Sequence, residues 1–175
     1  MRGFKRTATG VAVAAACCAS AFGLATTATA ATADETTCRG TIGARSIDGD
    51  VRVPSGATCR LRGTTVDGNV KIYRGATLVA TSARIGGSVQ SENARQVSVS
   101  GSRVGGSVQL KQGRGPISLS GNQVDSDIQL FSNVGRSVVS RNVVDGNLQC
   151  KSNQPKPIGG GNRVDGNKED QCARL

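Results

Sequence analysis

Aliphatic residues recur along most of this chain at a nearly constant interval of 19 or 20 residues. Each repeat begins with an aliphatic residue, continues through a short polar or glycine-containing segment and reaches a second aliphatic residue, as in Val66-Asp67-Gly68-Asn69-Val70. Self-similarity at this period is typical of a solenoid, in which each repeat buries its apolar face against its neighbours. The leading aliphatic residues are Ile47, Val66, Ile85, Val104, Val124, Val144 and Val164.

Within each repeat apolar and polar positions alternate, which predicts a strand with one buried face. In the repeat that begins at Val104 the alternation continues to Leu110, so we expect one strand over residues 104–110. A second short strand precedes each leading aliphatic residue by about seven positions, with inward pairs such as Val97 and Val99. Its end is marked by a glycine corner at Gly63, Gly101 and Gly121, and an inward amide stacks at an equivalent corner at Asn122, Asn142 and Asn162.

This period accommodates two or three short strands per turn, and no helical segment separates them. We therefore predict an all-β fold, a single-stranded parallel β-helix (β-solenoid) of about seven coils, each 19–20 residues long. Left-handed hexapeptide helices would require a multiple of six residues, which favours a right-handed coil. A meandering antiparallel sandwich is the competing fold, but it rarely repeats its sequence so regularly.

The first 33 residues have the composition of a secretory signal peptide. Arg2, Lys5 and Arg6 precede an apolar stretch that is too short to span a bilayer, and small residues follow it. Cys17 and Cys18 lie in that stretch, so a lipid-modified cysteine is the alternative, although only Ala stands in the three positions before Cys17. We assign residues 1–33 to the signal peptide, 34–46 to an N-terminal cap and 47–175 to the repeats with a C-terminal cap, and we expect no transmembrane anchor.

The composition of the remaining chain restricts both the core and the partners. Without the signal segment, 19 basic residues face 12 acidic ones, a net charge of about +7 that favours anionic partners weakly. Tyr73 and Phe131 are the only aromatic residues left, and the chain has no Trp and no His. A thin core of Val, Ile and Leu fits this inventory better than a conventional globular core.

Four cysteines lie after the predicted signal peptide, and an even number in an exported chain indicates disulfides. Cys38 and Cys59 are 21 residues apart, and Cys150 and Cys172 are 22 apart, about one coil in each case. Stacked coils place such residues roughly 5 Å apart at Cα, within the range of a disulfide. We therefore predict the pairs Cys38–Cys59 and Cys150–Cys172, which would cap the two ends. A metal site is the alternative, but no C-x-x-C pair and no His supports it.

Two outward polar sets are candidate sites. The first is an outward column dominated by Gln, which we interpret as a structural ladder rather than a polysaccharide-binding face because no aromatic platform is expected beside it. The second is the acidic and amide turn, such as Asp145 and Asn147, which we attribute to turn chemistry rather than to calcium, since the nine-residue period of calcium-binding β-rolls is absent. The Gln column comprises Arg52, Lys71, Gln90, Gln109, Gln129, Gln149 and Glu169.

Catalysis is not expected from this sequence, and we predict no cofactor or metal. Polysaccharide lyases and hydrolases on long β-helices use paired carboxylates, His or a basic residue in a long groove. The connections between the predicted strands are too short to build the walls of such a groove. A small polysaccharide-active enzyme, or the remnant of one, is the alternative to a non-enzymatic structural or binding module.

The basic residues point to a candidate binding face. Arg60 and Arg62 flank the inward Leu61, so both point outward, and Arg84 and Arg103 occupy the same register in successive repeats. We interpret these four arginines as a face for anionic cell-wall or matrix polymers; the alternative is a solvated surface that keeps the protein soluble. We expect no nucleic-acid partner, and a monomer.

The signal segment, the Asp-Gly-Asn-Val type of repeat and the C-terminal segment Gly166-Asn167-Lys168-Glu169-Asp170-Gln171-Cys172 resemble the small secreted β-solenoid proteins of high-GC Gram-positive bacteria. Many of those proteins have no assigned function, so the resemblance implies the fold and an extracellular or wall-associated location, but no activity. The chain is also loosely similar to bactofilin-type polymerising solenoids, although its signal peptide and disulfide caps depart from that pattern.

The inward column of second aliphatic residues gives a direct test of the predicted fold. Val108→Asp should destabilise the protein by about 4 kcal/mol or more, because an unpaired carboxylate would enter a dry core. Thermal unfolding followed by circular dichroism measures the effect. A variant that melts within a degree or two of the parent would show that Val108 is not in the core.

Overall fold

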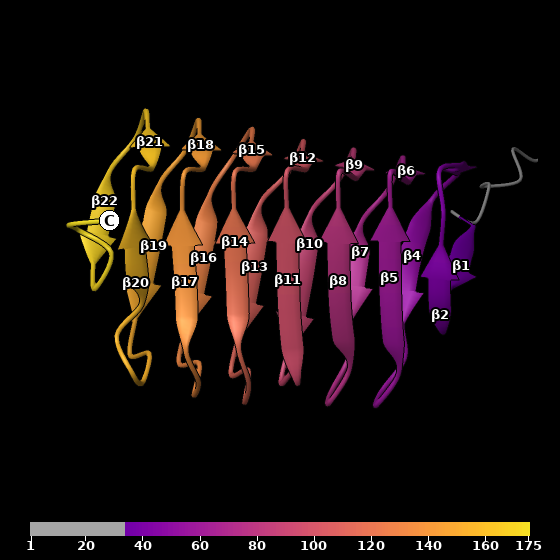
Figure 1. The fold of residues 1–175 in the computed structure, drawn as a ribbon, viewed down its shortest axis with the longest axis horizontal. Helices are drawn as coiled ribbons and strands as arrows, with labels where there is room; N and C mark the ends of the chain where they lie inside the picture. The colour runs from indigo at the N-terminus through magenta and orange to yellow at the C-terminus, as the bar shows by residue number, and fades with distance from the viewer. Residues whose placement is uncertain (1–33) are drawn as a thin grey trace, which may run out of the picture. The chain divides into compact units, whose positions relative to one another are not determined.

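A computed structural model describes residues 34–175, and every regular element within them is a β-strand. The predicted signal peptide at residues 1–33, with Cys17 and Cys18, lies outside the described residues. The strands form three parallel sheets, A, B and C, and each coil contributes one strand to each sheet (Figure 1).

Sheet A contains the longest series of strands and sheet B faces it across the core. In sheet A the strands are β1 (Glu35–Thr37), β4 (Asp50–Val53), β7 (Val70–Ile72), β10 (Val89–Glu92), β13 (Val108–Lys111), β16 (Ile128–Phe131), β19 (Leu148–Lys151) and β22 (Lys168–Asp170). In sheet B they are β2 (Gly40–Ile42), β5 (Thr58–Arg62), β8 (Thr77–Thr81), β11 (Gln96–Ser100), β14 (Ile117–Ser120), β17 (Ser137–Ser140) and β20 (Ile158–Gly160).

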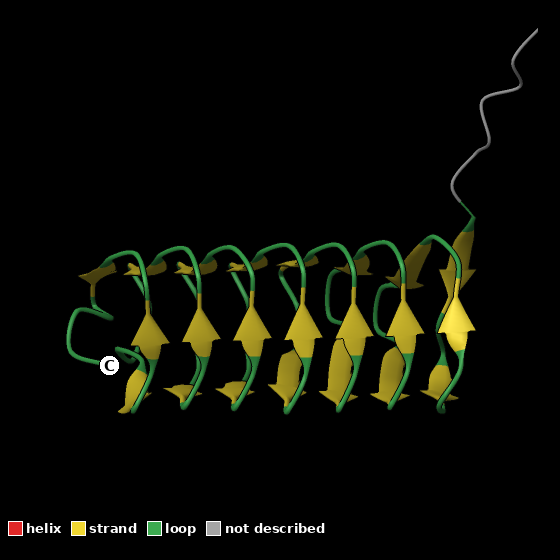
Figure 2. Ribbon diagram, turned by 90° about the horizontal axis from the view of Figure 1, so that it is seen from above, coloured by secondary structure: helices red, strands yellow, loops and turns green. Residues whose placement is uncertain are grey.

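Sheet C consists of two-residue strands and closes the third side of each coil. Its members are β3 (Ser46–Ile47), β6 (Thr65–Val66), β9 (Arg84–Ile85), β12 (Arg103–Val104), β15 (Gln123–Val124), β18 (Val143–Val144) and β21 (Arg163–Val164). From N- to C-terminus the chain climbs along sheet B, crosses through sheet C and descends along sheet A while advancing by one coil (Figures 1 and 2). The coil is therefore right-handed, and the predicted parallel β-solenoid is confirmed.

The predicted strand over residues 104–110 is wrong in one respect. Val104 ends β12 in sheet C, whereas Val108 begins β13 in sheet A, and the chain bends between them at residues 105–107. Alternation survives the bend because the residues on both sides face the same interior. The alternation of apolar and polar residues therefore cannot distinguish two strands joined by a bend from one straight strand. Each coil has three strands, one in each sheet.

The inward columns form a core that is almost entirely aliphatic. Val89 pairs with Val108, and Val108 with Ile128, in successive strands of sheet A. None of the six residues in this predicted column is more than 1% exposed, which confirms their burial. The column comprises Val51, Val70, Val89, Val108, Ile128 and Leu148.

The corner between sheets B and C joins a left-handed residue to a buried polar one. Gly121 adopts φ +64°, and Arg141 takes the same conformation at φ +56° one coil later. The next residue, Asn142, accepts hydrogen bonds from the backbone N–H and the side-chain amide of Asn122, both at 3.0 Å. Its own amide donates to Leu119 O and Asn162 Oδ1, also at 3.0 Å. The inward asparagine stack predicted at this corner is confirmed.

A second amide stack, which the sequence analysis did not predict, lies at the corner between sheets A and B. Asn133 is buried, and its backbone and side-chain N–H groups donate to Asn153 Oδ1 at 3.0 and 2.9 Å. The backbone N–H of Asn153 donates to Gln171 Oε1 at 2.8 Å. Gln171, in the segment after β22, therefore takes the place of the next asparagine in this stack.

Both predicted disulfides are present. Cys38–Cys59 and Cys150–Cys172 join Cα atoms 5.5 and 5.2 Å apart, one coil to the next. Residues 34–46, assigned above to a cap, supply β1 and β2 and so form the first rung of sheets A and B.

The asparagine stack predicts the effect of removing one amide. Asn142→Leu keeps the approximate size of the side chain but leaves the N–H of Asn122 and the carbonyl of Leu119 without partners. We expect a loss of roughly 3 kcal/mol in the free energy of unfolding, measured by chemical denaturation. Gln123→Leu, the same kind of change on an exposed neighbour, serves as the control and should have little effect. Equal effects of the two substitutions would contradict the structural role of the stack.

Candidate binding surface

The structure divides the four predicted binding arginines between two sheets. Arg60 and Arg62 are exposed on β5 and point outward from sheet B. Arg84 and Arg103 are exposed on β9 and β12 of sheet C, where they are direct partners in the strand register. The arginines therefore form two pairs on different sides of the coil.

Nearby aspartates offset the charge of the sheet C pair. The guanidinium of Arg103 binds both carboxylate oxygens of Asp125 at 3.1 and 3.3 Å. Arg84 and Arg103 line one hollow together with Asp67 and Asp125. A polyanion approaching this pair would meet carboxylates as well as guanidinium groups.

These aspartates belong to an edge of the solenoid on which carboxylates gather. The edge consists of the connections from sheet C to sheet A, which contain no Lys or Arg, together with Asp50, the first residue of β4. We call it the acidic edge. Its carboxylates are those of Asp48, Asp50, Asp67, Asp125, Asp127, Asp145 and Asp165.

Turn chemistry, which the sequence predicted for this segment, accounts for two carboxylates of the acidic edge, those of Asp50 and Asp127. Asp50 Oδ1 accepts the backbone N–H of Asn69 at 2.7 Å, and Asn69 Oδ1 accepts that of Ser88 at 2.9 Å. The same bond recurs in later coils, for example from Asn147 N–H to Asp127 Oδ1 at 2.7 Å. These oxygens therefore connect one coil to the next. In residues 34–175 no group of three or more possible metal ligands occurs.

Asp50 also forms the shortest ion pair on this edge. Its Oδ2 lies 2.6 Å from Lys71 Nζ, and its side chain is mostly buried. The hydrogen bond from Lys71, followed by that from the Asn69 backbone, lowers the pKa of Asp50 below its ordinary value of 3.8. The same bond raises the pKa of Lys71.

The opposite edge, between sheets A and B, carries only positive charge. The connections from sheet A to sheet B that follow β7, β10, β13, β16 and β19 contain one Lys or Arg residue each and no Asp or Glu. All five are exposed, and none forms an ion pair with any residue in the described part of the chain. We call this set the basic edge: Arg74, Arg95, Arg114, Arg136 and Lys156.

Sequence reasoning missed the basic edge because its residues are not at one fixed position of the repeat. The intervals between them vary from 19 to 22 residues, as the connections differ in length. The backbone nevertheless stacks them: the N–H of Arg114 donates to the carbonyl of Ala94, beside Arg95. Arg74, Arg95 and Arg114 line a single hollow of about 370 Å³.

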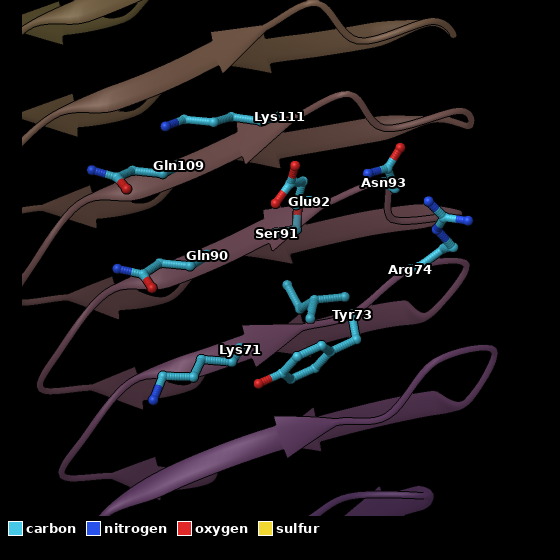
Figure 3. A pocket seen from close by; sticks show the side chains of 10 residues that line it. Lys71, Tyr73, Arg74, Gln90, Ser91, Glu92, Asn93, Gln109 and Lys111 are labelled. Atoms are coloured by element: carbon cyan, nitrogen blue, oxygen red, sulfur yellow. The ribbon is translucent and has the colours of Figure 1, made fainter.

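The outer face of sheet A lies between the two edges and carries the predicted Gln column. Gln129 Nε2 donates to Gln149 Oε1, and Gln149 Nε2 to Glu169 Oε2, both at 3.0 Å. This part of the column is the side-chain ladder that the sequence predicted. Among the described residues no such bond joins Gln90 to Gln109. Their amides point outward from successive strands (Figure 3).

Gln90 and Gln109 border a hollow of about 520 Å³ on sheet A, which we call the sheet A hollow. Tyr73, Glu92 and Lys111 line its other side, next to the basic edge (Figure 3). Tyr73 is 40% exposed. The expectation that no aromatic platform accompanies the Gln column is therefore wrong, because both aromatic residues of the repeat region lie outside the core on this face.

No protein-family model, curated protein or solved structure matches this chain. Its function therefore has to be inferred from its own surface.

A search for membrane-spanning helices among residues 34–175 finds none that is long and apolar enough.

The Asp50–Lys71 pair predicts how stability depends on pH. Because the folded-state pKa of Asp50 is lowered, the ion pair contributes fully to the free energy of unfolding at pH values well above the ordinary pKa of 3.8. This contribution is lost as the pH falls through the lower folded-state pKa. Asp50→Asn keeps the bond to Asn69 but loses the ion pair, on the order of 0.5 kcal/mol for a partly exposed pair. The difference in melting temperature between wild type and variant should therefore shrink as the pH falls below about 5 and disappear below the folded-state pKa of Asp50.

Asp127→Asn is the matched control, because Asp127 occupies the same position of a later coil and forms no ion pair with any described residue. Its difference from wild type should change less with pH. A constant difference for Asp50→Asn across this range would contradict the assigned ion pair.

Proposed function

We propose that this protein is a non-enzymatic, exported binding module that holds an anionic polymer of the cell envelope along its basic edge. The observation that carries the proposal is the separation of charge around the coil. Five exposed basic side chains that form no ion pair with any described residue follow one edge, while seven carboxylates follow another.

The arrangement suits an extended ligand rather than a compact one. The connections that carry Arg74 and Lys156 are four coils apart, which corresponds to about 19 Å along the solenoid axis. Like charges held this close repel one another, and a polyanion lying along the axis would relieve that repulsion at several coils together. The acidic edge would disfavour the same polymer on the other side of sheet A.

Two further observations support a binding module that works outside the cell. Hydrolysis by paired carboxylates needs two acidic groups across the scissile bond, whereas Glu92 is the only acidic residue that lines the sheet A hollow. Both ends of the solenoid are closed by disulfides, which persist in oxidising compartments.

Charge reversal at two positions of the basic edge tests this proposal. Arg95→Glu/Arg114→Glu should weaken retention on immobilised polygalacturonate or polyphosphate by at least about tenfold, because exposed charge contacts dominate the binding. Retention of the wild type should also fall steeply as salt rises from 0.05 to about 0.5 M, since screening shortens the range of these contacts.

The matched control is Arg84→Glu/Arg103→Glu, which changes the net charge equally on sheet C. We expect it to bind more tightly than the basic-edge variant, since Arg103 is already paired with Asp125. Equal losses in the two variants would mean that only net charge matters, and unchanged retention of the basic-edge variant would reject the proposal.

A further inference from the structure

The two aromatic side chains of the repeat region are placed where a solenoid core does not require them. Aromatic rings are usually well buried because they remove a large apolar area from water. Here the core is built without them, while Tyr73 is 40% exposed and Phe131 is half-buried. Two rings on one outward face leave apolar area that a ligand lying on that face would cover.

Both rings lie in one outward column of sheet A. Lys111 pairs with Glu92 on one side and with Phe131 on the other, and Phe131 pairs with Lys151. Tyr73 directly follows Ile72, the register partner of Ser91, and so continues the column beside Glu92. The rings are thus three coils apart, about 14 Å along the axis.

The surroundings of Tyr73 present its ring to the hollow. The Arg52 guanidinium lies 4.9 Å from the ring centroid and supports the ring from the neighbouring coil. The ring also lines the sheet A hollow, together with Gln90, Gln109 and the carboxylate of Glu92 (Figure 3). Glu92 forms no ion pair with any described residue, so its oxygens are available as hydrogen-bond acceptors.

This combination identifies a class of ligand. Flat apolar rings stack against the faces of sugar rings, and amide and carboxylate side chains bind the hydroxyl groups between them. A single-stranded nucleic acid also stacks on aromatic rings, but Gln90, Gln109 and Glu92 beside the rings suit the hydroxyl groups of a sugar better than a continuous line of phosphates. A polyphosphate or glycerol-phosphate chain offers nothing that stacks.

We infer that the polymer held by the basic edge is an acidic polysaccharide whose chain runs along sheet A, with sugar rings on Tyr73 and Phe131. Its hydroxyl groups bind Gln90, Gln109 and Glu92, and its acidic groups face Lys111 and the basic edge. This inference rests on the proposed function, which it narrows from any anionic polymer to one built of rings.

The experiment compares polygalacturonate with polyphosphate, which carries charge but no sugar ring. Tyr73 is the only tyrosine and the chain has no tryptophan, so intrinsic fluorescence reports on this one side chain. We expect polygalacturonate to change the tyrosine emission and polyphosphate to leave it unchanged. Tyr73→Ala/Phe131→Ala should weaken binding of polygalacturonate about tenfold and leave binding of polyphosphate unaltered.

Tyr73→Phe is the matched control, because it keeps the ring and should retain most of the affinity for polygalacturonate. Melting temperatures of all variants establish that they are folded, as both rings lie outside the core.

Equal binding of the two polymers with no effect of the double alanine variant would overturn the inference while the proposed function stands. Tighter binding of poly(dT) than of polygalacturonate would also overturn it. Failure of the wild type to bind any of these polyanions would reject the proposed function itself.

Discussion

Hydrogen bonding from one coil to the next is the constraint on which this structure depends. A coil of 19 or 20 residues has no helix and little core of its own, so its backbone and polar side chains must find partners in the coils on either side. At the corners this is done by side chains: Asn142 uses both its oxygen and its amide nitrogen to connect three coils. After β22, Gln171 supplies the amide in place of a further asparagine. The hydrogen bonds at the polar corners define the register of the stack. The aliphatic columns then stabilise it by burying apolar side chains.

The features predicted correctly from the sequence are those that recur at one position of every coil. The inward column that includes Val108, the asparagines at the corner of Asn142 and both disulfides all follow from a constant period, because stacking converts equal spacing into contact. The break after Val104 could not be predicted, since alternation continues through a bend when both sides face one interior. The second asparagine stack, at Asn133 and Asn153, was detectable as a 20-residue spacing but involves only two coils before Gln171. A signal that short is weak beside the seven-fold repeat.

The basic edge could not be predicted for a different reason. Its residues lie in connections of unequal length, so they share an edge of the solenoid without sharing a position in the repeat. The four arginines predicted from the sequence share a position by pairs: Arg84 and Arg103 have the same register, and Arg60 and Arg62 flank Leu61. Neither relation reveals that Arg103 is paired with Asp125. Charge in a solenoid therefore has to be assessed around the coil as well as along it. Here the acidic edge, the polar face of sheet A and the basic edge follow one another, with Tyr73 and Phe131 beside the basic edge.

The central claim is that an anionic polymer lies along sheet A and the basic edge, parallel to the solenoid axis. Amide chemical shifts of the ¹⁵N-labelled protein, titrated with oligogalacturonate, test it most directly, because each coil supplies reporters on all three sheets. The account predicts shift changes in the strands β7, β10, β13 and β16 and in the connections that follow them, which carry Arg74, Arg95, Arg114 and Arg136. Changes confined to β5, β9 and β12, with sheet A unaffected, would contradict it.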